Sequence, residues 1–435
     1  MSNLGQNVYM EIQPSNVVST GKVSYRAGNP VIQFIIGEND LHLFGSSVRF
    51  CGDIQFFRSS NRDIQVETDT NLMNIDPKLG IYNIIDTLTL SSQVHKSTIE
   101  RINNYNRFMA TYMPTISSET EALGHLNATT LVSPNKTTQR LQVVNNDNGE
   151  TGSPLYLGSS FCVNLPCGLL GGRNPIPLSR NNGVGGLMLE IQLSPDSQVL
   201  FSGTESNANI TDAFYELSNL KLIAEAQVVA PNTSVGNTFE YNSIHSYFNS
   251  INSTNAILNF QLGLSNVLGC FVNIIPSKYI NNLKYDGLGT YPILNDDDTP
   301  AEIDSIIFTR GGVRMPIDYI LETPNKSDAR QNQPDPNVFR FFMNSIADYN
   351  KNNHTQMSPY TYSELVGPVA SDINNMFAIG VPMDSISGQG INFQNVNFGL
   401  QMETKLTTDN PNALYLFVRN RSTLVFTANG VQVVS

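Results

Sequence analysis

The sequence contains no tryptophan, only 14% charged residues and only four cysteines among its 435 residues. Acidic residues outnumber basic ones by 37 to 25, which gives a formal net charge of -12, and lysine and arginine form no cluster. Nucleic acid and anionic membranes require such clusters, so sequence-specific nucleic-acid binding is not expected. No segment approaches the ~18 apolar residues of a membrane span, so any internal membrane would be contacted only indirectly.

The N-terminus lacks the charged region and the apolar core of a secretory signal, since its first cationic side chain is Lys22. We therefore expect a protein that is made and kept inside a cell. The cysteines have no disulfide-rich spacing and stand in apolar surroundings, which favours reduced, buried thiols over a bridge or a metal site. They are Cys51, Cys162, Cys167 and Cys270.

The motifs of common enzymes are also missing. The sequence has no phosphate-binding loop, no zinc-binding HExxH helix, no paired CxxC and no GxSxG nucleophile elbow. Ser218 and Lys221 have the spacing of some serine-lysine acylases, but their segment alternates as a strand and would not align the two side chains. The histidines are scattered without ligand spacing, which favours isolated surface or core residues over a metal site. They are His42, His95, His125, His245 and His354.

Carboxylates offer two further candidates for chemistry. Three consecutive residues, Asp296, Asp297 and Asp298, could hold calcium, but they lack the glycine and the distal glutamate of a calcium loop, so a solvated turn is favoured. A glycosidase pair could be drawn from Asp372, Asp384, Glu190 and Glu403, but the absence of tryptophan removes the usual sugar platform. We assign no catalytic, cofactor-binding or metal residue, and we expect no enzyme.

What the sequence does contain is a β-rich repeat. The segments GLMLEIQL (186–193), VLF (199–201) and YELSNLKLI (215–223) recur in looser form as GLQMETKL (399–406), LYLFV (414–418) and STLVF (422–426). We interpret both copies as period-two alternation, which is typical of half-buried antiparallel strands. Abundant polar loop residues and a length suited to two domains of roughly 200 residues agree with an all-β duplication.

The pattern divides the chain into an extended N-terminal arm (1–24), a first β domain (25–231) and a second β domain (232–435). Each domain is predicted to contain one helix. The first follows a capping box at Ser97 and Glu100 and stops at Pro114, and the second begins at Asp335 and Pro336. Hairpin turns are predicted at Gly311–Gly312 and Asn429–Gly430, and residues 115–155 form a long polar excursion.

Four segments carry a resemblance to a known family. They are GIYNII (80–85) leading to IERINNYNR (99–107), then GLL (168–170) with IPL (176–178) and GLMLEI (186–191), then FTRGGVRMP (308–316), and finally residues 414–431. In this order they resemble the double jelly-roll major capsid proteins of the adenovirus-like (PRD1-adenovirus) lineage, most closely those of polinton-like viruses and virophages. The chain is short for that family.

The resemblance implies two tandem eight-stranded antiparallel jelly rolls, each with a short helix in its connections. It also implies a homotrimeric, pseudo-hexameric capsomer that tiles an icosahedral shell around a DNA genome, with neighbouring capsomers and penton or minor capsid proteins as partners. The protein would then reside in the virion after assembly inside the host cell, with its arm tying subunits together.

Two rival functions remain open. One is a minor or penton capsid protein, which would usually contain a single roll, and the duplication speaks against it. The other is a β-sandwich that binds or hydrolyses carbohydrate, which would require two carboxylates facing one cleft.

Overall fold

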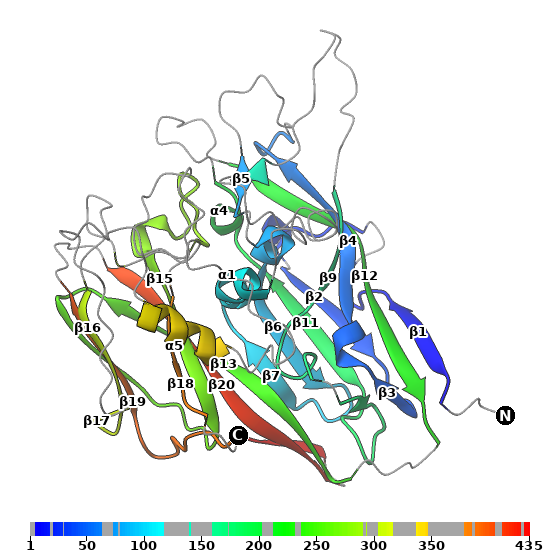
Figure 1. The fold of residues 1–435 in the computed structure, drawn as a ribbon. Coiled ribbons are helices and arrows are strands. Elements are labelled where there is room, and N and C mark those ends of the chain that lie inside the picture. Colours follow the sequence, from blue (N-terminus) through cyan, green and yellow to red (C-terminus); the bar gives the residue numbers. More distant parts are fainter. Residues whose placement is uncertain are drawn as a thin grey trace.

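The computed structural model describes residues 5–17, 21–28, 30–62, 73–76, 79–116, 139–140, 159–172, 174–201, 212–230, 236–289, 293, 303–315, 336–346, 378–384, 388–404, 411–427 and 430–435. Two β-sandwiches lie side by side (Figure 1). The strands of the first end at Val228 and those of the second begin at Thr238, so the predicted boundary at 231/232 falls between them. None of the described helices combines the length and the apolar character needed to cross a bilayer.

The first sandwich is built from two antiparallel sheets. Sheet 1A has the order β1-β12-β4-β9 and consists of β1 (Asn7–Ile12), β12 (Phe214–Val228), β4 (Arg49–Phe57) and β9 (Ser159–Asn164). Two short strands, β3 (Leu41–Leu43) and β10 (Ile176–Pro177), extend it beside β12. Sheet 1B has the order β2-β11-β6-β7 and consists of β2 (Val31–Ile36), β11 (Leu187–Leu193), β6 (Ile85–Ser92) and β7 (Thr98–Ile102). A separate pair joins β5 (Asn74–Ile75) to β8 (Gln139–Arg140).

The second sandwich repeats this plan. Sheet 2A has the order β13-β20-β15-β18 and consists of β13 (Thr238–Ile251), β20 (Asn412–Thr427), β15 (Val267–Pro276) and β18 (Ile379–Pro382). Sheet 2B has the order β14-β19-β16-β17 and consists of β14 (Asn255–Phe260), β19 (Phe398–Thr404), β16 (Ile303–Arg310) and β17 (Val313–Arg314). The last strand, β21 (Gly430–Val434), pairs with the end of β20.

The two sandwiches share one connectivity. If the eight principal strands of each are numbered in chain order, one sheet reads 1-8-3-6 and the other 2-7-4-5 in both halves. This is the nested Greek-key order of a jelly roll. The predicted all-β, double jelly-roll fold is therefore confirmed, and we call the two sandwiches the first and second roll. The repeat segments 186–193 and 399–404 fall in the equivalent strands β11 and β19.

The helices follow the prediction only in part. Helix α1 (Tyr105–Ile116) and helix α5 (Pro336–Ile346) each follow the fifth principal strand of their roll, as expected. The predicted start of the first helix is wrong, because Thr98–Ile102 pairs with β6 as strand β7, and the helix also continues past Pro114. The spacing of Ser97 and Glu100, which is typical of a helix capping box, therefore occurs at the start of a strand. A further short helix, α4 (Asp196–Val199), precedes β12.

The predicted turns are borne out where the structure describes them. Gly311 and Gly312 both adopt positive φ (57° and 83°) and connect β16 to β17 as a two-residue hairpin. Strands β20 and β21 pair through Thr427 and Gly430, as the second turn requires. Asp335, Asn429 and most of the excursion at 115–155 lie outside the described residues.

The predicted N-terminal arm needs correction. Strand β1 pairs with β12 over six residues and is the first strand of sheet 1A, so this part of the arm belongs to the first roll. Farther along, the Ser15 N–H donates to the Gln33 carbonyl (2.7 Å) and Asn16 Nδ2 donates to the Val31 carbonyl (2.7 Å). These contacts cover the edge of β2. The described part of the segment is therefore held by its own roll.

The four sheets stack in a row. From right to left in Figure 1 the order is 1A, 1B, 2A, 2B, with α1 lying between the rolls. Inward-facing side chains alternate with outward-facing ones in β2 and β12, which fills the core of the first roll with aliphatic and aromatic residues. Within one chain, the outer faces of 1A and 2B are the two ends of this row.

Candidate functional site: the junction between the two rolls

Within the described part of the chain, the residues considered for catalysis are not assembled into a site. Ser218 and Lys221 lie in β12, where Asn219 has positive φ (51°) and the register shifts, and the Lys221 ammonium contacts Glu11 (3.1 Å). Among the described residues, no three His, Cys, Asp or Glu side chains are grouped as metal ligands. The candidates Asp296, Asp297, Asp298, Asp372, His125 and His354 lie outside the described residues.

The described carboxylates of the proposed glycosidase set lie on different sheets. Glu190 lies in β11 of the first roll, where Gln33 donates to it (3.0 Å), and Glu403 lies in the equivalent strand β19 of the second roll. Asp384 follows β18 on the opposite sheet of that roll. A surface cleft of about 320 Å³ lies beside the β2–β3 turn and residues 179–182, and it is lined by polar groups that include Glu38 and Arg180 (3.9 Å apart). No carboxylate pair for glycoside hydrolysis follows from these positions.

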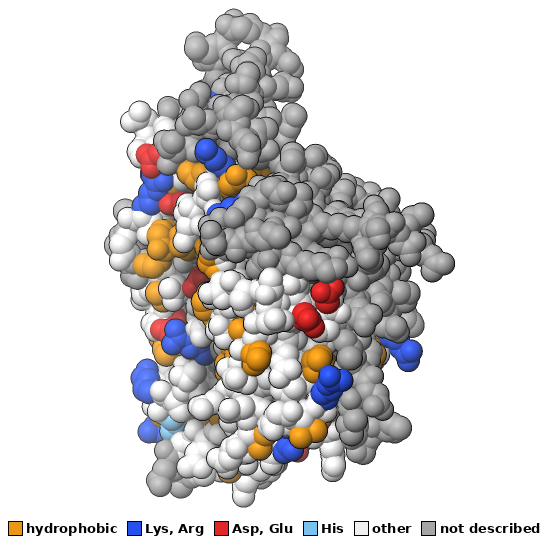
Figure 2. All heavy atoms as spheres, turned by 90° about the vertical axis from the view of Figure 1, so that its left-hand side faces the viewer, with side chains coloured by type: hydrophobic (Ala, Val, Ile, Leu, Met, Phe, Trp, Pro, Cys, Tyr) orange, Lys and Arg blue, Asp and Glu red, His pale blue; other side chains and the backbone are white. Residues whose placement is uncertain are grey.

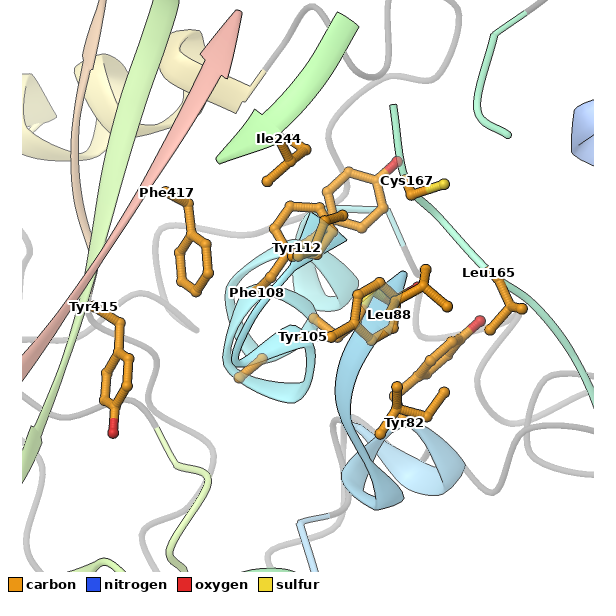
Figure 3. Close-up of a cluster of buried hydrophobic side chains, with 14 of the residues drawn as sticks. Tyr82, Leu88, Tyr105, Phe108, Tyr112, Leu165, Cys167, Ile244, Tyr415 and Phe417 are labelled. Atoms are coloured by element: carbon orange, nitrogen blue, oxygen red, sulfur yellow. The ribbon is translucent and has the colours of Figure 1, made fainter. Parts of the chain in front are cut away.

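The most elaborate arrangement of buried side chains is instead the junction between the rolls. Its apolar part centres on Phe108 of α1, whose ring stacks on Tyr112 (5.4 Å) and meets Phe417 (5.8 Å) and Phe271 (6.1 Å) of sheet 2A. Figure 3 shows α1 with Phe108 directed towards Phe417 of β20, and with Tyr82 and Leu88 on its other side. The aromatic side chains thus join the core of the first roll to the outer face of sheet 2A.

Glu100 of β7 is the central polar residue of this junction. Its buried carboxylate accepts hydrogen bonds from three backbone N–H groups, those of Gly168 (3.0 Å) and Leu169 (2.8 Å) in the first roll and Ile244 (2.9 Å) in β13 of the second. Burial raises the pKa of Glu100, and the three amide bonds oppose that rise because they favour the carboxylate. One side chain therefore ties two segments of the first roll to the second roll.

Backbone contacts surround Glu100 closely. The Tyr241 hydroxyl donates to the Ile99 carbonyl (2.8 Å), and a Cβ atom added to Gly168 would lie 2.0 Å from the Asn242 carbonyl oxygen. Only glycine allows these two backbone segments to approach so closely here. Just after the C-terminal end of β7, the Asn103 N–H donates to Ser246 Oγ (3.1 Å). Hydrogen bonds therefore connect β7 and the residue that follows it to β13 at three points.

Arg107 is the second buried charge of the junction. It lies in α1 with no exposed surface, its guanidinium stands 4.7 Å from the ring centre of Tyr415, and it donates to the Gly287 carbonyl. The Asn273 side-chain amide of β15 donates to Thr111 Oγ1 of the same helix (3.2 Å). Arginine suits this place because its planar cation can stack on an aromatic ring and still donate from its edge.

Sequence reasoning did not assign either residue to the junction. The sequence predicts Glu100 as part of a helix cap, and it includes Arg107 only as the last residue of segment 99–107, which carries the family resemblance. A usable signal was present for Glu100: it stands between the apolar residues Ile99 and Ile102, so its carboxylate had to meet buried donors or solvent.

Comparison with known proteins supports the fold. No family model and no curated protein matches the sequence. Three solved structures share the fold over nearly the whole chain: the Faustovirus major capsid protein (TM-score 0.60, 11% identity, covering 97% of this chain and 90% of that one), a chain of the Sputnik virophage (0.56, 13%, 100% and 89%) and a chain of the PBCV-1 virus capsid (0.55, 10%, 100% and 98%). The double jelly roll is thus the arrangement that these viral proteins also have.

Proposed function

We propose that this chain is a viral major capsid protein that forms homotrimeric, pseudo-hexameric capsomers. The observation that carries the proposal is a difference between two equivalent sheet faces. The outer face of sheet 2A is covered by α1 and β7 of the first roll and by α5, so that all ten residues of β15 and the first nine of β20 are buried. The outer face of sheet 1A has no such cover within the described part of one chain.

The exposure of side chains in β1 and β12 agrees with an uncovered outer face of sheet 1A. Tyr9 of β1 is 76% exposed on that face, and β12 alternates between buried and half-buried residues instead of being buried on both sides. The first roll covers the outer face of sheet 2A within the chain. We expect the second roll of another copy to cover the outer face of sheet 1A in the same way. The contact within the chain is therefore the template for the contact between chains.

The opposite end of the row supplies the matching surface. The outer face of sheet 2B carries Ile257 of β14 (66% exposed) and Val313 of β17 (65% exposed). Figure 2 views this end of the molecule, where single hydrophobic side chains stand among polar ones. A contact between the face of 2B in one copy and the face of 1A in the next is head-to-tail, and such contacts close into rings when the rotation allows. Three copies would place six rolls in one ring.

The remaining features agree with a shell protein. The net charge of -12 and the absence of cations before Lys22 do not suit a segment that condenses DNA, so we propose that the genome is packaged by other components. Neighbouring capsomers and penton or minor capsid proteins are the proposed partners, and the virion is the proposed location. The polar surface of Figure 2 suits many shallow contacts rather than one reactive pocket. We keep the division into two rolls at 231/232, with β1 in the first.

The test is the mass and shape of the purified protein, measured by light scattering on a sizing column and by negative-stain imaging. We expect trimers with a hexagonal outline. Tyr9→Glu, on the face of 1A, should yield folded monomers, whereas Val434→Glu, at a 53% exposed position of β21 away from both end faces, should still assemble. A wild-type monomer at every protein and salt concentration would reject the capsomer, and glycan-array binding would then favour the carbohydrate-binding alternative.

A further inference from the structure

Two of the four cysteines face each other on the outer side of sheet 1A. Cys51 of β4 and Cys162 of β9 are register partners, and their Sγ atoms are 2.7 Å apart. Register partners in antiparallel strands have Cα separations of about 4.5 or 5.5 Å, and both values lie within the range that a disulfide spans. The two sulfur atoms need to approach by only about 0.7 Å to reach the covalent distance of about 2.05 Å.

The surroundings of the pair differ from those of the other two cysteines. Cys167 and Cys270 have no exposed surface, whereas Cys162 is half-buried and can be reached by a small reagent. The cationic side chains of Lys221 and Arg49 stand near Cys51 on this face. The expectation of buried thiols therefore holds for Cys51, Cys167 and Cys270, and Cys162 departs from it.

We propose that Cys51 and Cys162 are a dithiol that a low-molecular-weight disulfide oxidises to an intrachain disulfide between β4 and β9. The Cys162 thiolate attacks one sulfur of the reagent, which forms a mixed disulfide and releases one small thiolate. Cys51 then loses its proton and attacks Cys162 Sγ, which releases the second small thiolate. In total the two cysteines lose two electrons and two protons, and the reagent becomes two thiols.

The order of these steps follows from the geometry. Cys162 is the more exposed sulfur, so it meets the reagent first. Burial raises the pKa of Cys51 to about 12, and the hydrogen bond to Cys162 adds to this rise, so Cys51 is protonated until the mixed disulfide stands beside it. The closed bridge would fasten the edge strand β9 and enclose the chain between two residues 111 positions apart. A loop of that length gives a large stabilisation, corresponding to a rise of about 5 °C in the thermal midpoint of a protein of this size.

The experiment is incubation of the native protein with oxidised glutathione, followed by intact mass, non-reducing peptide mapping and thermal unfolding. The protein in which the pair is accessible, either wild type or the monomeric Tyr9→Glu, should lose two hydrogens, retain no glutathione and link the Cys51 and Cys162 peptides. It should also unfold about 5 °C higher until a reductant is added. Cys51→Ser should stop at a stable glutathione adduct on Cys162. Cys162→Ser should not react, because Cys51 is buried.

The inference is independent of the capsid proposal, although assembly as proposed would cover the pair. The reaction is therefore run on wild type and on Tyr9→Glu, with the mass of each measured by light scattering. A bridge in both proteins, or only in the monomeric one, supports the dithiol. A wild-type protein that keeps a lasting glutathione adduct, or a monomer that loses no thiols, overturns it.

Discussion

Substitution of Glu100 by glutamine is the most direct test of the junction between the rolls. Glutamine has the same shape, and its Oε1 can still accept from Gly168 and Ile244 as the carboxylate does. Its other terminal atom is an NH2 group, which would face the Leu169 N–H that Oε2 now accepts (2.8 Å). A buried donor that loses its acceptor costs about 1–3 kcal/mol, so Glu100→Gln should lower the free energy of unfolding by that amount. Glu100→Ala removes the acceptor of all three amides and should cost about 3–5 kcal/mol.

The assay is urea unfolding at fixed pH together with amide hydrogen exchange. Both variants should unfold at lower urea, and exchange should rise at Leu169 in the glutamine variant and also at Gly168 and Ile244 in the alanine variant. Glu403→Gln, at an exposed carboxylate of β19, is the matched control and should change stability by less than about 0.5 kcal/mol. If Glu100→Gln is as stable as the control and Leu169 remains protected, the carboxylate does not hold the rolls together as argued.

Three further predictions concern the same region. Gly168→Ala should cost about 3 kcal/mol or more, because its Cβ would collide with a carbonyl at 2.0 Å, while Gly172→Ala, with its nearest atom at 3.5 Å, should be close to neutral in the same urea assay. Arg107→Met should lower stability by about 2–3 kcal/mol through loss of the Tyr415 contact and one carbonyl partner, whereas Arg101→Met, on the exposed side of β7, should have little effect; equal losses would refute a special role. Burial lowers the pKa of His245 from 6.5 to about 4, so the neutral form is favoured in the fold and stability is complete above about pH 6.5. As pH falls towards 4 the unfolded chain binds the proton first and up to about 3 kcal/mol is lost, and His245→Gln should remove this part of the pH dependence of the urea midpoint.

The sequence contains enough local information to predict most of the fold. Alternating segments identified the equivalent strands β11 and β19, and a glycine pair located the β16–β17 turn, because both signals depend only on neighbours in the chain. The predictions were wrong where residues distant in the sequence determine the local structure. Ser97 and Glu100 have the spacing of a helix cap, but pairing with β6 and amides from two other segments make their surroundings a strand. Residues 7–12 form a short segment with polar neighbours on both sides, and only pairing with β12, some two hundred residues away, makes them a strand.

The apolar pattern of residues 414–418 also differs from the predicted alternation. The repeat aligns residues 414–418 with 199–201 and predicts alternation in both copies, yet 414–418 is LYLFV, a continuous apolar run. It lies in the first half of β20, the strand equivalent to β12. A continuous run indicates a strand that is buried on both faces. In β12 the equivalent positions alternate, and their outer side chains are half-buried. The difference in burial between β12 and β20 therefore indicates which outer sheet face is covered within one chain. In the capsomer proposed above, a second copy would cover the outer face of sheet 1A, where Tyr9 is 76% exposed.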